Sequence, residues 1–216
     1  LMRPSLDLLS LLRQSKALNE ATNGLFDPTV QSVWEHLSAW YAGQPDRAPS
    51  PPDLLTRALD TVGMDRVEIT TARVGLARGT RLTLNGIAQG YITDRVAELL
   101  RRRGWTHVLV DLGEVSAIGG RPTGQPFDVA IRDSGIRLPL ENAALATSSI
   151  NGFVFSPHSR QSHLINPHTP AAPVHWQSVT VRNSRATIAD GLSTALALAS
   201  PAEVMGVARR FRDTQV

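Results

Sequence analysis

The chain has 216 residues, with 22 Lys and Arg against 19 Asp and Glu, and a formal net charge of +3. It is long enough to bury a sizeable core, and its composition is that of an ordinary globular protein. There is no cysteine, which excludes disulfides, thiol chemistry and zinc–thiolate sites. The basic residues are scattered and little interleaved with aromatic residues, so no nucleic-acid partner is expected. No apolar run approaches the ~18 residues of a membrane span, so no transmembrane segment is expected either.

The first sixty residues are expected to be helical. Residues 4–22 place leucines on a broad apolar face. Further along, Asp27 is a natural N-cap and Pro28 a natural first helical residue, which predicts a second helix that continues through Leu37. A third helix is expected to end at about Val62. Three helices before any strand indicate a helical layer laid against a sheet that follows.

Residues 81–104 are the segment around which the rest is organised. They predict a short strand, a tight turn from Gly86 to Gly90, and an amphipathic helix that ends at the last glycine of the segment. Asp94 and Glu98 are interpreted as the solvated face of this helix. A turn bracketed by glycines lets backbone groups approach a phosphate or a cation closely, but a strand–turn–helix without a ligand explains the pattern as well. The apolar face is formed by Ile87, Tyr91, Ile92, Val96, Leu99 and Leu100.

Short strands are expected on both sides of this helix. The candidates are residues 67–70, 74–77, 82–84, 107–112, 127–132, 143–148, 153–155, 163–165 and 178–182. Helices over residues 187–199 and 201–211 close the chain. These elements predict a mixed α/β (α+β) fold with much antiparallel sheet. No internal repeat or clear linker divides the chain, so a single domain over residues 1–216 is expected.

Two places carry residues suited to chemistry. Asp190 and Thr194 stand four apart on one helix face, so a carboxylate and a hydroxyl lie side by side, and hard cations such as Mg²⁺ bind such oxygens. The same stretch fits a capping box in which Asp190 turns back to the helix start near Thr187. His163 precedes an Asn-Pro turn, where it fits either a general base or a hydrogen-bonded structural residue.

Six short motifs stand in order along the chain. They are Gly24-Leu-Phe-Asp27-Pro, Leu84-Asn-Gly-Ile-Ala-Gln-Gly-Tyr91, Val110-Asp-Leu-Gly113, Leu145-Ala-Thr-Ser148, Ser162-His-Leu-Ile-Asn-Pro167 and Ala189-Asp-Gly-Leu-Ser-Thr194. Together they resemble the ApbE family, the magnesium-dependent FAD:protein FMN transferases. The resemblance implies a tunnelling-fold-like core with antiparallel sheet and packed helices. It also implies transfer of FMN from FAD to a Thr or Ser hydroxyl of a target flavoprotein, with release of AMP. FAD pyrophosphatase activity, or FAD binding without turnover, are the alternatives that stay open.

The resemblance also assigns roles to residues. Asp190, Thr194 and the backbone carbonyl of Gly86 would bind Mg²⁺. His163 would be the base or a phosphate contact. The residues that would contact FAD are Leu25, Phe26, Asp27, Thr83, Gln89 and Ile165. For localisation the resemblance implies a periplasmic or membrane-associated bacterial protein, and a cytoplasmic location stays open.

Several positions depart from the pattern of the family. Thr83 replaces an Asp, and Gln89 replaces a Lys whose charge would lie near phosphate, so weaker FAD binding is expected. The segment Asp111-Leu-Gly-Glu-Val115 stands for Asn-Leu-Gly-Gly-Asp and is expected to lose the final acid. Asn166 takes the place of the Asp after the histidine. The amino-terminal segment of the family, with its Met-Gly-Thr strand, is expected to be missing before Leu1, and the presence of the last strand stays open.

Overall fold

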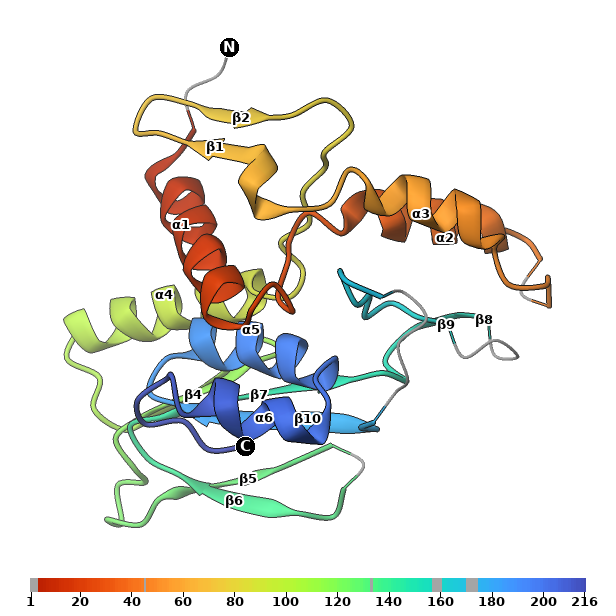
Figure 1. The fold of residues 1–216 in the computed structure, drawn as a ribbon. Helices are drawn as coiled ribbons and strands as arrows, with labels where there is room; N and C mark the ends of the chain where they lie inside the picture. The colour runs from red at the N-terminus through yellow and green to blue at the C-terminus, as the bar shows by residue number, and fades with distance from the viewer. Residues whose placement is uncertain (1–3, 45, 133, 157–160, 170–174) are drawn as a thin grey trace.

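The computed structural model describes residues 4–44, 46–132, 134–156, 161–169 and 175–216 (Figure 1). The α-helices of this part are α1 (Leu6–Ala21), α2 (Gln31–Tyr41), α3 (Pro52–Leu59), α4 (Ala88–Arg102), α5 (Ala186–Ala197) and α6 (Pro201–Ala208). A 3₁₀ helix, η1 (Met64–Arg66), precedes the strands β1 (Val67–Ile69), β2 (Val74–Leu76), β3 (Val108–Asp111), β4 (Val115–Ile118), β5 (Phe127–Ala130), β6 (Arg137–Leu140), β7 (Ala144–Ser149), β8 (Val154–Ser156), β9 (Gln161–Ser162) and β10 (Ser178–Asn183). Every pairing between these strands is antiparallel. The expected mixed α+β class is confirmed.

A four-stranded sheet in the order β10-β7-β4-β3 forms the platform of the fold. β10 and β7 pair over six residues each, whereas β4 pairs with β7 only through Val115 and Ser116. β7 therefore runs beyond β4, toward Thr147 and Ser148. Helices α4 and α5 lie on one face of this sheet, and the β5–β6 hairpin lies on the other (Figure 1).

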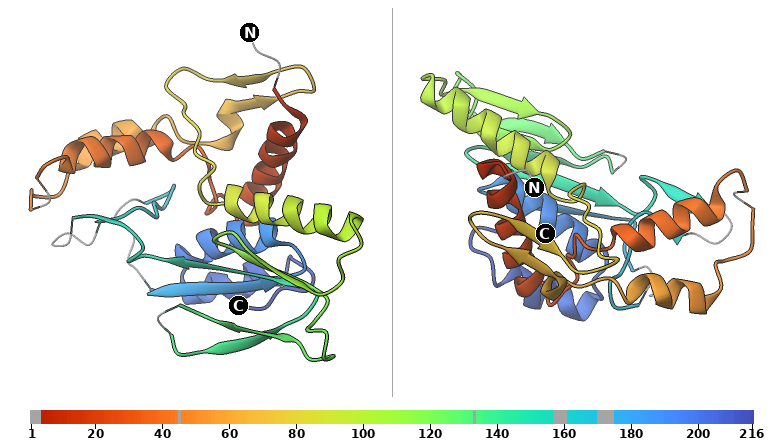
Figure 2. Two further views of the ribbon diagram at one scale, coloured as in Figure 1. Left: turned by 180° about the vertical axis from the view of Figure 1, so that it is seen from behind. Right: turned by 90° about the horizontal axis from the view of Figure 1, so that it is seen from above.

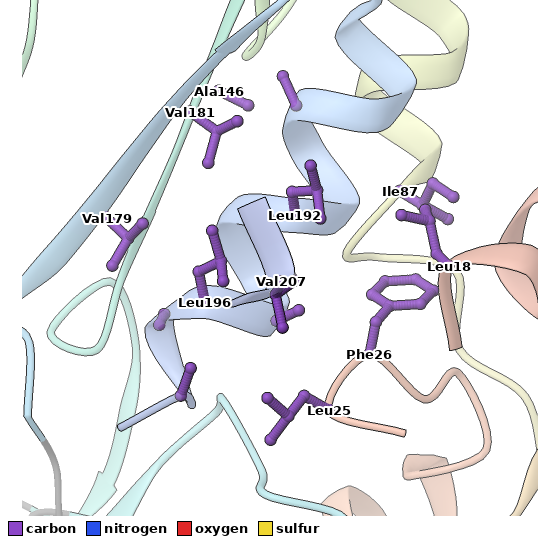
Figure 3. Close-up of a cluster of buried hydrophobic side chains, with 14 of the residues drawn as sticks. Leu18, Leu25, Phe26, Ile87, Ala146, Val179, Val181, Leu192, Leu196 and Val207 are labelled. Atoms are coloured by element: carbon purple, nitrogen blue, oxygen red, sulfur yellow. The ribbon is translucent and has the colours of Figure 1, made fainter. Parts of the chain in front are cut away.

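Helix α5 forms the centre of the main hydrophobic core. Ten of its twelve residues are buried, and Leu192 and Leu196 are completely so. Figure 3 shows these two side chains between Val181 of β10 on one side and Phe26 and Leu18 on the other. A helix that is apolar nearly all round is typical of a core position, so the polar residues on α5 need a specific reason to be there.

The expectation that the three amino-terminal helices form the layer on the sheet is wrong. The helices on the sheet are α4 and α5, and α1 packs mainly on α5 rather than on the sheet. Helices α2 and α3 pack against each other and against β8, to one side of the sheet (Figure 2). α5 presents enough apolar surface to pack against the apolar face of α1. The amino-terminal helix therefore forms a third layer, after the sheet and the α4–α5 pair. No helix in the described part of the chain is long and apolar enough to cross a membrane.

The expected start of the second helix is also wrong. α2 begins at Gln31, and Asp27 does not cap it. The Asp27 carboxylate instead accepts hydrogen bonds from the backbone N–H of Thr29 at 2.8 Å and from Nδ2 of Asn19 at 3.2 Å. Such a local side-chain turn competes with helix formation, so residues 27–30 form a buried turn before the helix.

Two of the expected strands are not strands. Residues 82–84 have no ladder pairing, and the isolated bridge to Val30 lies one residue earlier, at Arg81. At residues 163–165 the ladder has already ended, since β9 stops at Ser162. The Ser162 hydroxyl accepts a hydrogen bond from the Leu164 N–H at 3.2 Å, and this local bond replaces a ladder bond.

Helix α4 begins and ends close to the expected positions, and Gly104 has the left-handed conformation of a helix stop, with φ +84°. Its expected apolar face is wrong in part. Ile92 and Leu99 are 54% and 51% exposed, whereas Gly90, Thr93 and Ala97 are buried. The buried stripe consists of small residues because α4 lies directly against α5, and a large side chain would hold the two helices apart.

Candidate active site

The glycine turn before α4 lies directly on α5. The backbone N–H of Gly90 donates a hydrogen bond to Oδ2 of Asp190 at 2.9 Å. A Cβ atom at Gly90 would lie 2.7 Å from the Cβ of Asp190, and one at Gly86 would lie 3.0 Å from Oγ1 of Thr194. Gly90 therefore permits a backbone approach that a side chain would block, and a side chain at Gly86 would crowd Thr194. The structure thus brings Gly86, Asp190 and Thr194 together, from positions about a hundred residues apart.

The first turn of α5 is capped from α4, not from within α5. Oδ1 of Asp94 accepts from the Ala186 N–H at 2.8 Å, and Oδ2 accepts from the Thr187 N–H at 2.9 Å. The Thr187 hydroxyl also donates to Oδ2. Both sequence interpretations were wrong here: Asp94 is not on a solvated face, and Asp190 is not part of a capping box. Because Asp94 satisfies the helix start, Asp190 is left to face the glycine turn.

Three hydroxyl side chains, those of Ser148, Ser193 and Thr194, lie together where β7 meets α5. Oγ of Ser148, where β7 runs beyond β4, lies 2.8 Å from Oγ of Ser193 and 3.3 Å from Oγ1 of Thr194. Ser193 in turn donates to the backbone carbonyl of Asp190 at 2.9 Å. Ser148 ends one of the sequence motifs, but no role was assigned to it. Only the strand register shows that its side chain meets α5.

Two buried carboxylates carry the charge of this site. Asp190 is 4% exposed, and burial raises its pKa to about 7, with the Gly90 N–H acting in the opposite direction. Glu114, in the turn between β3 and β4, is 8% exposed, and its pKa is raised to about 8, first by burial and then by Asp190. Within the described residues neither carboxylate has an ion pair with Lys, Arg or His. Sequence reasoning missed Glu114, although it lies inside a motif that departs from the family.

The donor set at this place fits a hard divalent cation. In the described chain no three His, Cys, Asp or Glu side chains are grouped to hold a metal, so a cation must also use hydroxyl or carbonyl oxygens. Asp190 has a buried carboxylate and Thr194 a hydroxyl close to the Gly86–Gly90 turn, where a backbone carbonyl is the remaining predicted ligand. Mg²⁺ and Ca²⁺ prefer such oxygen donors. The buried charge of Asp190 without a cationic partner is the observation that favours a cation here.

Some of the residues expected to contact FAD lie around the same turn, whereas Ile165 packs with α2. Leu25 and Phe26 are 5% and 3% exposed and pack into the core, where the Phe26 ring would lie 3.4 Å from a Cβ at Gly86 (Figure 3). The backbone N–H of Thr83 donates to the Pro28 carbonyl at 2.8 Å and joins the two segments. The Phe26 side chain thus lies against the turn, and both side chains belong to the core. The FAD contacts themselves stay a prediction.

Gln89 faces the turn between β3 and β4. Its Nε2 lies 2.8 Å from where a Cβ at Gly113 would stand, and Gly113 has a φ of +104°. The next residue is Glu114, so the neutral amide at the position of the family lysine lies against the turn that carries this buried carboxylate. A lysine in its place would bring a cation to the same turn.

His163 is held mainly by the Phe153 carbonyl, with the Ser162 hydroxyl 3.4 Å from its Nδ1. Its Nδ1 lies 2.9 Å from the Phe153 carbonyl, and its ring meets that of Phe153 edge-on. A carbonyl only accepts, so the neutral ring carries its proton on Nδ1 and keeps a free lone pair on Nε2. No described hydrogen bond or ring contact joins His163 to Asp190 or Thr194.

The segment after His163 returns to the amino-terminal loop. Oδ1 of Asn166 accepts from the His168 N–H at 2.9 Å, and Nε2 of His168 lies 2.9 Å from the Asn23 carbonyl. Ile165 is 4% exposed and packs with α2. The histidine motif and the Gly24–Pro28 motif are therefore neighbours, and Asn166 keeps the turn without a carboxylate.

The fold and the site define a class of protein. A mixed α+β chain holds a glycine turn against a buried polar patch on its central helix, an arrangement suited to a cation with a bound phosphate. The sequence matches the ApbE family over residues 2–216, and the chain belongs to this family.

Individual relatives show how far the similarity extends. The chain is 29% identical over 226 residues to the FAD:protein FMN transferase of Haemophilus influenzae, covering 95% of this chain and 64% of that protein. It is 28% identical over 225 residues to the FAD:protein FMN transferase of Salmonella typhimurium, covering 94% of this chain and 62% of that protein. It thus spans slightly less than two thirds of the length of these relatives.

Solved structures of the family have the same fold. The flavinyl transferase ApbE of Pseudomonas stutzeri, in its apo form, superposes with a TM-score of 0.77 at 30% identity, covering 93% of this chain and 65% of that one. The ApbE protein of Thermotoga maritima superposes with a TM-score of 0.82 at 28% identity, covering 96% of this chain and 70% of that one. The expected ApbE-like fold is confirmed.

Proposed function

We propose that this chain carries the catalytic site of an FAD:protein FMN transferase. The reaction moves FMN from FAD to a Thr or Ser hydroxyl of a target flavoprotein, depends on Mg²⁺ and releases AMP. The observation that supports the proposal is the contact of the Gly86–Gly90 turn with α5, in which the Gly90 N–H bonds to Asp190 and Gly86 lies close to the Thr194 side chain. Membership of the family supplies the reaction to which such a site belongs.

The covalent step is a phosphoryl transfer. The acceptor hydroxyl oxygen forms a bond to the phosphorus of the FMN half, the bond from that phosphorus to the bridging oxygen breaks, and AMP leaves with that oxygen. Mg²⁺, when bound, neutralises pyrophosphate charge and that of the leaving group. Asp190, Thr194 and the Gly86 carbonyl would hold it. The chain has to position FAD and to remove the proton of the acceptor hydroxyl.

His163 is the proposed acceptor of that proton. A hydroxyl does not ionise at neutral pH, so a base has to take its proton as the bond to phosphorus forms. The contact between Nδ1 and the Phe153 carbonyl keeps the lone pair on Nε2, which is the form a base needs. Leu25, Phe26, Asp27, Thr83, Gln89 and Ile165 are the proposed FAD contacts, the first two through their backbone.

The direct test measures both products. The purified chain is mixed with FAD, Mg²⁺ and a flavoprotein subunit that carries an acceptor threonine, and AMP is measured by chromatography while attached FMN is measured by intact-mass spectrometry. AMP and FMN-modified subunit in equal amounts support the proposal. The control acceptor has valine in place of the threonine, and the control enzyme carries Asp190→Asn.

The same mixture separates the alternatives. AMP with free FMN, in the presence or absence of an acceptor, would identify an FAD pyrophosphatase. Binding of FAD without AMP, also in excess Mg²⁺, would identify a protein that binds the nucleotide without turning it over. Either result would contradict the transferase proposal.

A further inference from the structure

Glu114 is a buried carboxylate for which the reaction outlined above has no use. It stands in the β3–β4 turn, immediately after Gly113, and the residue is 8% exposed. Acids are rarely buried unless a cation or several hydrogen bonds stabilise them. In the described part of the chain Glu114 has no ion pair, and one backbone N–H, that of Thr147, bonds to its carboxylate.

The β3–β4 turn is fixed against the same glycine turn that holds Asp190. The Thr93 hydroxyl donates to the Glu114 carbonyl at 3.4 Å, and the Gln89 amide packs on Gly113. Both residues belong to the first turns of α4, where the Gly90 N–H bonds to Asp190. Glu114 and Asp190 therefore approach the start of α4 from two sides, one from the sheet and one from α5.

Among the residues that the structure describes, no cationic side chain pairs with either of the two carboxylates. Asp190 is the charged group that acts most strongly on Glu114, and it carries the same sign. Oδ2 of Asp190 accepts from Gly90, and the described residues offer no donor to its Oδ1. Two buried like charges, each with free oxygen lone pairs, are stable together as a pair of anions only if a cation stands between or beside them.

We propose that Glu114 supplies a second carboxylate to the cation site built on Asp190, Thr194 and the Gly86 carbonyl. This inference rests on the proposed cation site and adds a residue to it. A site with two carboxylates binds divalent cations more tightly than a site with one, because affinity rises with the ligand charge. Glu114 would thus provide the negative charge on the sheet side of the cation, next to the neutral Gln89.

The test measures cation binding without FAD. Mn²⁺ alone is titrated into the metal-free protein, and free Mn²⁺ is followed by electron paramagnetic resonance. We expect Glu114→Gln to weaken binding by about 10–100-fold and Asp190→Asn to weaken it further. The matched control is Asp111→Asn, an exposed acid at the end of β3 just before the turn, whose change should stay within about twofold. Equal Mn²⁺ affinity of wild type and Glu114→Gln would overturn the proposal, as would a wild type that binds no Mn²⁺.

A second measurement guards against a variant that is merely misfolded. Glutamine keeps an oxygen for the Thr147 N–H, so in EDTA the melting temperature of Glu114→Gln should equal or exceed that of wild type. The rise in melting temperature on adding Mg²⁺ should be smaller in the variant. If Glu114→Gln melts lower in EDTA and gains as much from Mg²⁺, Glu114 has a structural role and the proposal fails.

Gln89→Lys provides an independent variant that leaves Glu114 in place. Its ammonium group would lie beside Glu114 and compete with the cation, so Mn²⁺ affinity should fall. Unchanged affinity in this variant would count against Glu114 as part of the site. The two proposals can fail separately. If Mn²⁺ binding depends on Glu114 but FAD yields no AMP, only the transferase reaction is contradicted. If AMP is produced but Mn²⁺ binding does not depend on Glu114, only this inference is contradicted.

Discussion

The backbone N–H of Gly90 donates to the Asp190 carboxylate across the interface of α4 and α5, and the two residues stand so close that a Cβ at Gly90 would lie 2.7 Å from that of Asp190. This contact fixes the glycine turn on the central helix. It also orients one carboxylate oxygen and leaves the other for a ligand. The candidate site therefore depends on how closely the two helices approach.

Gly90→Ala tests that approach. The added methyl group meets backbone and side-chain atoms that cannot move away easily, so the free energy of unfolding should fall by about 1–3 kcal/mol or more. Urea unfolding measures this change. The control is Gly206→Ala in α6, where a Cβ meets nothing within 4 Å and alanine should stabilise the helix by about 0.5–1 kcal/mol. Equal effects of the two substitutions would contradict the close packing of α4 on α5.

The cap that Asp94 places on α5 gives a second prediction. Asp94→Ala leaves two backbone N–H groups without a partner, so the free energy of unfolding should fall by about 0.5–2 kcal/mol. Glu98→Ala, one turn further along α4, removes only exposed ion pairs with Arg95 and Arg102 and should change it by about 0.5 kcal/mol or less. Thermal unfolding of both variants decides between a capping role and a merely solvated face. If Asp94→Ala loses no more stability than Glu98→Ala, Asp94 does not stabilise α5 as a cap.

The metal-free protein should lose stability as the pH rises. The pKa of Glu114 is about 8 and that of Asp190 about 7, both above their values in an unfolded chain, so the folded state binds more protons between about pH 4 and 8. The stabilisation is complete below the unfolded pKa and is lost as the pH passes through the folded one. Besides burial, the charged groups that raise the pKa of Glu114 are Asp190 and Asp111.

Urea unfolding in EDTA at a series of pH values measures this loss. Glu114→Gln should flatten the decline above pH 7, because glutamine does not titrate, whereas Asp111→Asn should alter it far less. Added Mg²⁺ should restore stability most strongly at the high-pH end, where both carboxylates are charged. A stability that stays level or increases from pH 5 to 8 in EDTA would show that the pKa values are not raised.

Replacing His163 tests the proposed base. His163→Ala should lower FMN transfer by about 10²–10⁴-fold, the usual range for a positioned base, while FAD affinity changes little. His107→Ala is the control, since its Nδ1 bonds to the Gly120 carbonyl at the far end of β3 and has no part in the proposed reaction. Turnover and FAD titration are measured on the same preparations. If His163→Ala turns over as fast as wild type, the histidine only supports the segment after β9.

Gln89→Lys should also change FAD binding. Without metal, an ammonium group beside the glycine turn supplies the positive charge that a pyrophosphate requires, so FAD affinity should rise by about 1–2 kcal/mol. Titration of FAD fluorescence in EDTA measures the gain. Gln89→Met is the control, because it fills the same volume without charge. No gain from the lysine would mean that it pairs with Glu114 alone and does not reach phosphate.

The sequence by itself determined the class of the fold and most of its elements. Periodicity predicted α1, α4 and the strands β7, β8 and β10 in outline, because spacing along the chain decides which residues can form one face. Gly104 also had its expected role as the helix stop, since backbone conformation depends on local chemistry. The motifs in order were sufficient to indicate the family.

Only the tertiary structure decided which polar groups meet. Asp94 and Glu98 stand four residues apart on α4, as neighbours on one helix face do, yet Asp94 caps α5 and Glu98 faces solvent. Asp190 fits a capping box in sequence, but the carboxylate of another helix already fills that role. Glu114 became a candidate ligand because the end of the β4–β7 ladder and the first turns of α4 bury it near Asp190. Burial and charge pairing depend on residues distant in sequence, and local pattern carries no information about them.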